Sequence, residues 1–226
     1  MTSVANNLAT IQAKVEKACH RIDRSPDDVN IVAVTKYVSV ERTKEAYEAG
    51  IKHLAENRDE GFIQKIQALG TEPTWHFIGS LQSRKVKMVI DSIDMLHSLD
   101  RLSLAKEIQK RSTRVVPCFL QVKTTDEATK HGLAIHELDA FVKALAEMDK
   151  ISIVGVMTMA PVGGDEEAIR RSFRLAREIK ESIQQKNLPY APCNELSMGM
   201  SGDFELAIEE GSTYIRIGSS LVGEKA

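Results

Sequence analysis

Short runs of β-branched and apolar residues alternate with amphipathic stretches along almost the whole chain of 226 residues. Each run has the length and composition of a strand that is buried on both faces, and helical periodicity follows it. The pattern predicts eight strands, over residues 29–34, 53–56, 75–79, 95–99, 115–122, 151–157, 194–198 and 213–217. Strands that alternate with helices form a parallel sheet, because each helix carries the chain back to the edge where the next strand begins.

Helical periodicity is predicted between these strands and also before the first of them. An apolar stripe that runs from Val4 to Ile22 predicts a leading helix. The other predicted helices lie at 41–49, 59–69, 83–90, 101–111, 136–148, 165–185 and 203–209. Eight strand–helix units in a chain of this length fit a closed barrel near the lower limit of size, because such barrels take about 200 to 250 residues. We therefore predict an α/β fold with one domain over residues 1–226, a single (β/α)8 TIM barrel preceded by an N-terminal helix; a wide, open, doubly wound sheet is the alternative.

The charge balance and the apolar pattern exclude several classes of protein. The chain has 30 Lys and Arg against 32 Asp and Glu, a formal charge of −2, whereas nucleic-acid binders usually carry a basic excess. The sequence has no run of 18 or more apolar residues, so it predicts no membrane span. Its polar, amphipathic start predicts no signal peptide. The three cysteines are far apart, so we expect buried thiols and a reducing cytoplasm. We expect no metal site.

Lys36 is the first candidate for a reactive side chain. It follows the first predicted strand, and reactive groups in (β/α) barrels gather at the C-terminal ends of strands. A lysine that leaves the barrel wall there is expected to be partly desolvated, which favours Schiff-base formation. The alternative is a lysine that extends to solvent at the rim.

Two loops rich in glycine and serine follow the last two strands. Ser201-Gly202 opens a helix, and Gly218-Ser219-Ser220 follows strand eight. Small residues let backbone N–H groups approach a ligand, and the loops after strands seven and eight are the usual phosphate site of this architecture. Turns without a ligand are the alternative. A Schiff-base lysine beside a phosphate site indicates pyridoxal 5′-phosphate (PLP) or a class I aldolase of sugar phosphates.

A series of motifs in a fixed order distinguishes these two possibilities. The motifs are VAVTK at 32–36, ENR at 56–58, HFIGSLQ at 76–82, HSLD at 97–100, GVMTM at 155–159, LSMGMSGD at 196–203 and RIG at 216–218. In this order the chain resembles the pyridoxal phosphate homeostasis protein family, which is related to the N-terminal barrel of alanine racemase. The resemblance extends over nearly the whole chain.

The resemblance implies that PLP is the cofactor and that the chain binds it as an aldimine of Lys36. It implies that Ser201, with backbone groups of Gly218 and Ser219, holds the phosphate, and that Arg216 lies near the pyridine nitrogen. The full set of implied cofactor-binding residues is Lys36, Asn57, His76, Met200, Ser201, Arg216, Gly218 and Ser219.

Two positions depart from the family pattern. Arg84 and Lys123 stand where the family commonly has Asn, and both changes add positive charge near the expected mouth. Lys130 and Gly132 match a Lys-x-Gly element of the loop after strand five, at the expected mouth.

The implied role is intracellular PLP homeostasis, by storage, buffering or delivery of the cofactor, rather than catalysis. An arginine beside the pyridine nitrogen keeps that nitrogen unprotonated, which weakens the electron sink of PLP. Alanine racemase also uses a tyrosine from a second domain, for which the predicted barrel leaves no room. The expected partners are PLP and apo forms of PLP-dependent enzymes, with no nucleic acid and no membrane, and the expected state is a monomer or weak dimer. The alternatives are a small single-domain racemase of amino acids and a docking module with a basic rim.

Overall fold

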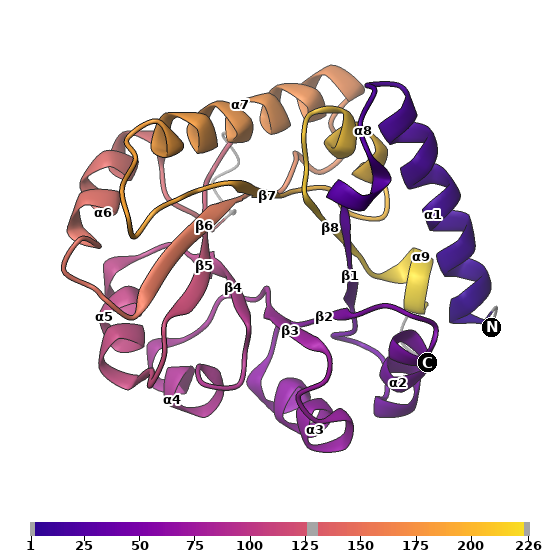
Figure 1. Ribbon diagram of the computed structural model, residues 1–226, viewed down its shortest axis with the longest axis horizontal. Helices are drawn as coiled ribbons and strands as arrows, with labels where there is room; N and C mark the ends of the chain where they lie inside the picture. The colour runs from indigo at the N-terminus through magenta and orange to yellow at the C-terminus, as the bar shows by residue number, and fades with distance from the viewer. Residues whose placement is uncertain (1–2, 126–130, 224–226) are drawn as a thin grey trace.

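Eight parallel strands form a closed barrel in the computed structural model, which describes residues 3–125 and 131–223 (Figure 1). Each strand pairs with the next along the chain, and β8 pairs with β1 to close the sheet. The prediction of a (β/α)8 barrel is therefore confirmed. The strands are β1 (Asn30–Val34), β2 (His53–Glu56), β3 (Thr74–Phe77), β4 (Met95–Leu99), β5 (Val116–Gln121), β6 (Ile151–Met157), β7 (Glu195–Ser197) and β8 (Tyr214–Ile217).

Helices surround the barrel as an outer ring (Figure 1). The predicted leading helix is present and packs beside α2, α8 and α9, so both ends of the described chain lie on one side of the ring. The helices are α1 (Val4–His20), α2 (Val40–Glu48), α3 (Asp59–Leu69), α4 (Val86–Val89), α5 (Leu102–Arg111), α6 (Leu138–Ala144), α7 (Glu166–Gln184), α8 (Phe204–Glu209) and α9 (Ser219–Val222).

Four elements differ clearly from the sequence-based expectation. The helix predicted at 83–90 is a 3-10 turn at Ser83–Lys85 that leads into the four-residue helix α4. The helix α9 follows β8 where we expected only a loop, because four residues are too few to show helical periodicity. The helix α6 begins after a 3-10 turn at Ile135–Glu137 and ends at Ala144, so it is shorter than predicted. The strand β3 ends at Phe77, two residues early, and the chain then passes close to the backbone of Asn57.

The barrel has two packed regions of different character. The larger region lies between the strands and the helices and is almost wholly apolar. The smaller one is built around Val32, Ala55, Phe119, Met157 and Tyr214. Three histidines contact this smaller cluster, since the rings of His53, His76 and His97 pack against Tyr214. The inside of such barrels is usually filled by branched apolar side chains, so polar rings there need hydrogen-bond partners.

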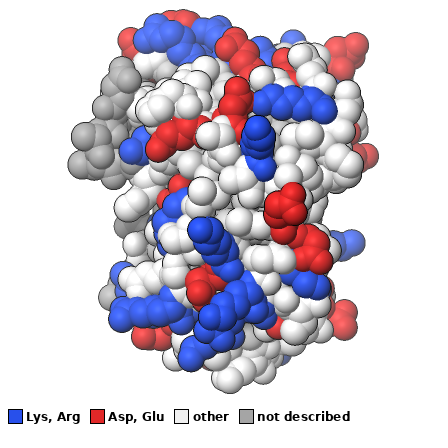
Figure 2. All heavy atoms as spheres, turned by 90° about the vertical axis from the view of Figure 1, so that its left-hand side faces the viewer, with Lys and Arg blue, Asp and Glu red and all other residues white. Residues whose placement is uncertain are grey.

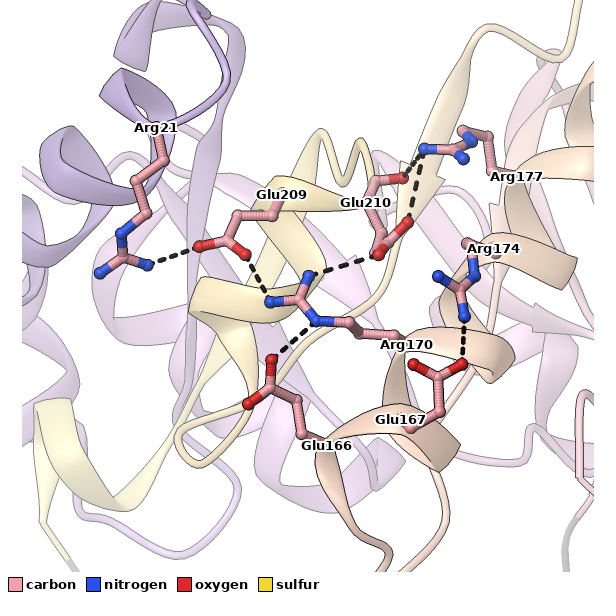
Figure 3. A network of polar contacts seen from close by, with 8 residues as sticks. All are labelled: Arg21, Glu166, Glu167, Arg170, Arg174, Arg177, Glu209 and Glu210. Carbon is pink, nitrogen blue, oxygen red and sulfur yellow. Dashed lines mark hydrogen bonds and ion pairs between the residues drawn. The ribbon is translucent and has the colours of Figure 1, made fainter.

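A network of ion pairs fastens α8 to α7 and to the end of α1 (Figure 3). Arg170 of α7 contacts Glu209 at the end of α8 and the next residue, Glu210, at 2.6 and 3.3 Å. Arg21, just after α1, lies 2.5 Å from Glu209. Arg177 adds a further contact to Glu210 at 3.6 Å. Because a network orders several charges together, it holds α8 more firmly than isolated surface pairs would.

The outer surface carries both signs of charge. On the face drawn in Figure 2, basic side chains gather over the lower half, where α4 and α5 lie, with acidic side chains among them. In the described residues, the helices are all too short or too polar to cross a bilayer. Cys19, Cys118 and Cys193 are buried free thiols, as predicted. Burial raises the pKa of Cys193 to about 12, which keeps this thiol protonated and unreactive at neutral pH.

Candidate functional site

A cavity of about 640 Å³ opens at the C-terminal ends of the strands. Its volume is within the range of small-molecule sites, about 300 to 1,000 Å³. It is lined by Val34, Lys36, Tyr37, Val38, Asn57, Ile78, Gly79, Met157, Met159, Met200, Ser201, Gly202, Arg216, Gly218, Ser219, Val222 and Gly223. Seven of the eight predicted site residues are in this lining, and they come from β1, β2, β7, β8 and the loops that follow them.

Lys36 lies at the edge of the cavity, two residues after β1. Its side chain is exposed, so the expected partial desolvation is not seen. The amine Nζ lies 4.9 Å from the centre of the Tyr37 ring, which is close enough for a cation–π contact. An amine in this position is free to reach a carbonyl carbon that enters the cavity.

Arg216 is the charged group at the base of the cavity. It is 4% exposed, and its Nη1 donates to Oγ of Ser197 at 2.7 Å, while its Nη2 donates to the carbonyl oxygen of Thr158 at 2.9 Å. Burial lowers the pKa of Arg216 to about 10, and the carboxylate of Asp203 acts in the opposite direction. The guanidinium therefore stays charged at neutral pH and offers the cavity only donors.

Two loops form the side of the cavity that suits an anion. Ser201 and Gly202 lie between β7 and α8, and Gly218 and Ser219 begin α9. A Cβ added at Gly202 would meet no atom within 4 Å, so the backbone there faces open space. The first N–H groups of α9 have no partner inside that helix, so they are available to an anion.

Asn57 and Gly79 line another part of the cavity wall. Oδ1 of Asn57 is buried and has no hydrogen-bond partner among the described residues. Such an atom is an acceptor for a donor group of a ligand. A Cβ at Gly79 would lie 2.2 Å from the carbonyl oxygen of Asn57, so only glycine lets these two loops approach so closely.

His76 is the predicted residue that the structure does not bring to the cavity. It is fully buried inside the barrel, two residues before Ile78, whose side chain lines the cavity from the same face of the chain. His76 is therefore one layer deeper. Its ring nitrogens lie within hydrogen-bond distance of His53 and His97, at 2.9 and 2.8 Å.

The positions that depart from the family pattern lie outside the cavity lining. Nε of Arg84 donates to Oε1 of Gln82 at 2.9 Å, and the backbone of Lys123 pairs with Leu133. Lys130 lies outside the described residues. Ser80, Leu81 and Gln82 line a neighbouring cavity of about 300 Å³, which shares Asn57 with the larger one.

A buried ion pair supports Lys36 and Asn57, and sequence reasoning missed it. Nζ of Lys65 on α3 contacts Oε1 of Glu56 and donates to the carbonyl oxygen of Thr35 at 2.5 Å. The hydroxyl of Thr35 donates to the same carboxylate at 2.8 Å. Thr35 directly precedes Lys36, and Glu56 directly precedes Asn57. The contacts among Lys65, Glu56 and Thr35 therefore fix the ends of β1 and β2. In the sequence, Lys65 had only the appearance of an ordinary helical lysine.

Comparison with known proteins gives one consistent family. The sequence profile described as "Alanine racemase, N-terminal domain" matches residues 6–226. The chain is 37% identical to the "Pyridoxal phosphate homeostasis protein" of Aquifex aeolicus, over 99% of both chains. It is 34% identical to the protein of that name from Escherichia coli K12, over 100% of this chain and 98% of the other.

A solved structure agrees with these relatives. The structure of PipY from Synechococcus elongatus PCC7942 "with PLP bound" superposes with a TM-score of 0.85 and 32% identity. The match covers 97% of this chain and 100% of that one.

The buried pair leads to a stability prediction. Lys65→Met leaves the Glu56 carboxylate buried without its cation, and we expect it to lower the free energy of unfolding by about 3–5 kcal/mol. Urea unfolding measures this cost. Lys44→Met is the control, because Lys44 is exposed on α2 and contacts Glu48 only at 3.7 Å. The double variant Lys65→Met with Glu56→Gln should recover part of the loss. Equal costs for Lys65→Met and Lys44→Met would contradict the role given to the pair.

Proposed function

Because the chain belongs to the pyridoxal phosphate homeostasis proteins of the alanine racemase N-terminal domain family, we propose that it binds PLP on Lys36. One observation carries this proposal: an exposed lysine amine and two glycine–serine loops open into the same cavity. The protein would hold the cofactor in the cytoplasm and supply it to apo forms of PLP-dependent enzymes.

The residues around the cavity fit PLP in charge and in chemistry. PLP supplies an aldehyde that combines with amines and a pyridine ring that accepts electrons when its nitrogen is protonated. Lys36 provides the amine for covalent attachment. The unpaired Oδ1 of Asn57 is available to a donor on the bound molecule, and His76 supports the site from the layer below.

The phosphate is assigned to the two loops after β7 and β8. Ser201 offers a hydroxyl, and the backbone N–H groups of Gly218 and Ser219 lie at the start of α9. Met200 closes the outer side, with 39% of its surface exposed. The ion-pair network on α8 keeps the Ser201 loop in place, since α8 begins directly after that loop (Figure 3).

Arg216 favours holding the cofactor over using it in catalysis. A guanidinium that faces the pyridine nitrogen donates a hydrogen bond and leaves that nitrogen unprotonated. This limits the negative charge that the ring can accept.

A racemase also needs a second base across the cofactor from the lysine. Tyr37 is the tyrosine that lines the cavity, and its ring contacts Nζ of Lys36 itself. Tyr47, Tyr190 and Tyr214 are absent from the lining. The arrangement therefore supports a carrier of PLP and gives no specific support to a racemase.

Trapping the cofactor tests the attachment to Lys36. After incubation with PLP, borohydride reduction should remove the visible absorbance band and leave the pyridoxyl group on the peptide that contains Lys36. Lys36→Ala and Lys36→Arg should both lose this adduct, because neither side chain forms an imine, whereas Lys44→Ala should keep it. Mass spectrometry of the digested protein identifies the site. A reducible adduct that persists in Lys36→Ala would overturn the assignment.

The phosphate assignment makes a separate prediction for Gly202. Its Cβ position faces open space, so Gly202→Ala adds a methyl group to the cavity without a clash inside the protein. We expect PLP to bind about ten-fold more weakly, or about 1.4 kcal/mol. Pyridoxal, which has no phosphate, should bind as it does to the unchanged protein. Absorbance titration measures both. An equal loss for the two ligands would place the phosphate elsewhere.

Supply of PLP is tested by its transfer to an apo-enzyme. If the protein delivers the cofactor, activity of the apo-enzyme should return faster than PLP escapes to a free amine scavenger. The same preparation, incubated with alanine or serine in deuterium oxide, should exchange little hydrogen at the α-carbon. Transfer no faster than release would contradict delivery, and rapid exchange would indicate an enzyme.

A further inference from the structure

Three histidines, one serine and one arginine form a continuous line of hydrogen bonds inside the barrel. Nδ1 of His53 lies 2.9 Å from Nε2 of His76, and Nδ1 of His76 lies 2.8 Å from Nε2 of His97. Nδ1 of His97 lies 2.8 Å from Oγ of Ser197, which accepts from Nη1 of Arg216 at 2.7 Å. We call these five residues the histidine chain.

The histidine chain reaches both ends of the barrel. Arg216 lines the cavity at the C-terminal ends of the strands. His53 is the first residue of β2 and is half-buried. It lines a different cavity of about 470 Å³, formed at the N-terminal ends of β1 and β2 together with residues of α1. The line of hydrogen bonds therefore connects two separate cavities.

The direction of these hydrogen bonds follows from Arg216, which can only donate. The oxygen of Ser197 accepts a hydrogen bond from Arg216. Among the described residues, the Ser197 hydroxyl then donates its own hydrogen to Nδ1 of His97. A neutral imidazole has one N–H and one lone pair. His97 then donates from Nε2 to His76, and His76 donates from Nε2 to His53. Every ring turns its lone pair towards the arginine.

The charged groups around the histidine chain make His53 the first ring to gain a proton. Burial, and then the neighbouring His53, lower the pKa of His76 to about 3. Burial, His76 and Arg216 hold the pKa of His97 well below its usual value. Burial also lowers the pKa of His53, but there Asp94 opposes the shift while Lys52 adds to it.

The remaining neighbours are aromatic rings, apolar side chains and two carboxylates at the outer cavity. Phe119 of β5 stacks on His97 at 4.3 Å. The ring of Tyr214 on β8 contacts all three histidines, and burial, with Glu195 of β7 as a second cause, raises its pKa, so it stays neutral. Glu16 of α1 and Asp27 line the outer cavity with His53. On β1 and β6, the interior residues Val32 and Met157 carry no charge.

A proton gained by His53 reverses every hydrogen bond of the histidine chain. Both nitrogens of a protonated imidazole are donors, so Nδ1 of His53 no longer accepts from His76. His76 and His97 must then carry their hydrogens on Nδ1, one position closer to the arginine. The oxygen of Ser197 becomes the acceptor of both His97 and Arg216, and its hydroxyl hydrogen turns away. The net change is one added proton.

We propose that the histidine chain couples the charge of His53 to the ligand cavity, so that bound PLP and a protonated His53 favour each other. The coupling rests on the function proposed above. The negative phosphate offsets the buried charge of Arg216, which lowers the cost of a second positive charge on the same line of hydrogen bonds. By linkage, a protonated His53 strengthens PLP binding by the same factor.

The ligand-free protein tests the direction of the hydrogen bonds. With ¹⁵N-labelled histidine, NMR at neutral pH should show His76 and His97 as the tautomers with hydrogen on Nε2. Hydrogen on Nδ1 of both rings would overturn the assignment. This measurement does not depend on PLP.

Titration of His53 tests the coupling itself. The pKa of His53 is measured by NMR in the free protein and in protein whose PLP is fixed by borohydride reduction. We expect PLP to raise this pKa by about half a unit, which is about a three-fold change in proton affinity. In Ser197→Ala the histidine chain is cut next to Arg216, and the shift should disappear. An unchanged pKa, or the same shift in Ser197→Ala, would overturn the proposal.

A second variant covers the case in which Ser197→Ala does not fold. His53→Gln keeps an acceptor at the half-buried end and removes the titrating group. The PLP affinity of the unchanged protein should exceed that of His53→Gln only at acidic pH, below the lowered pKa of His53, and should match it at neutral pH and above, where His53 carries no charge. His20→Gln, at an exposed position of α1, is the control and should behave like the unchanged protein. If PLP binding has the same pH dependence in His53→Gln as in the unchanged protein, the coupling is overturned. If the unchanged protein forms no borohydride-reduced adduct on Lys36, the proposed function is contradicted instead.

Discussion

The hydrogen-bonded pairing of β8 with β1 is the interaction on which the rest of the site depends. It places Val32 opposite Arg216 and Ala33 opposite Ile217, although these residues lie far apart along the chain. Lys36 and Gly218 then leave adjacent strands at the same end of the barrel. In an open, doubly wound sheet β1 and β8 would not be neighbours, and no single cavity would contain both the amine and the two glycine–serine loops.

The closed barrel also encloses polar groups, which sets limits on what the site can do. Arg216, His76, His97 and Ser197 are all at most 4% exposed, and such groups are costly to bury unless each has a partner. They partner one another along the histidine chain and, through Arg216, reach the carbonyl oxygen of Thr158. Lys65 and Glu56 form a second buried group beneath Lys36. The cavity therefore has a buried positive charge at its base, while Lys36 is exposed at its edge. This combination suits reversible storage of an anionic aldehyde.

Much of the fold and part of the site could be predicted from local sequence patterns. Apolar runs located the eight strands, and three of them have the predicted bounds, His53–Glu56, Met95–Leu99 and Ile151–Met157. Lys36 and the loops at Ser201 and Gly218 were found because position at a strand end is itself a local signal. The exposure of Lys36 matches the alternative of a lysine that extends to solvent at the rim. The sequence left both alternatives open, because the outcome depends on how Tyr37 and the loops around it pack.

The features that sequence reasoning missed depend on contacts between strands. Lys65 sits among polar residues of an amphipathic helix, and only the packing of α3 against β2 turns it towards Glu56. His53, His76 and His97 are separated by more than twenty residues each, and the register of β2, β3 and β4 brings them together. A chain of hydrogen bonds across strands leaves no periodic trace in the sequence. The family resemblance placed His76 near the cofactor, whereas its observed hydrogen-bond contacts are with the two other histidines.

We propose that Lys36, Arg216 and the two glycine–serine loops hold one molecule of PLP at the mouth of the barrel. The most direct measurement is a crystal structure of the protein loaded with PLP and reduced with borohydride. We expect continuous density from Nζ of Lys36 to the cofactor, with the phosphate at Ser201 and at the start of α9, and with the pyridine nitrogen facing Arg216. Density on another lysine, or a phosphate outside these loops, would contradict it.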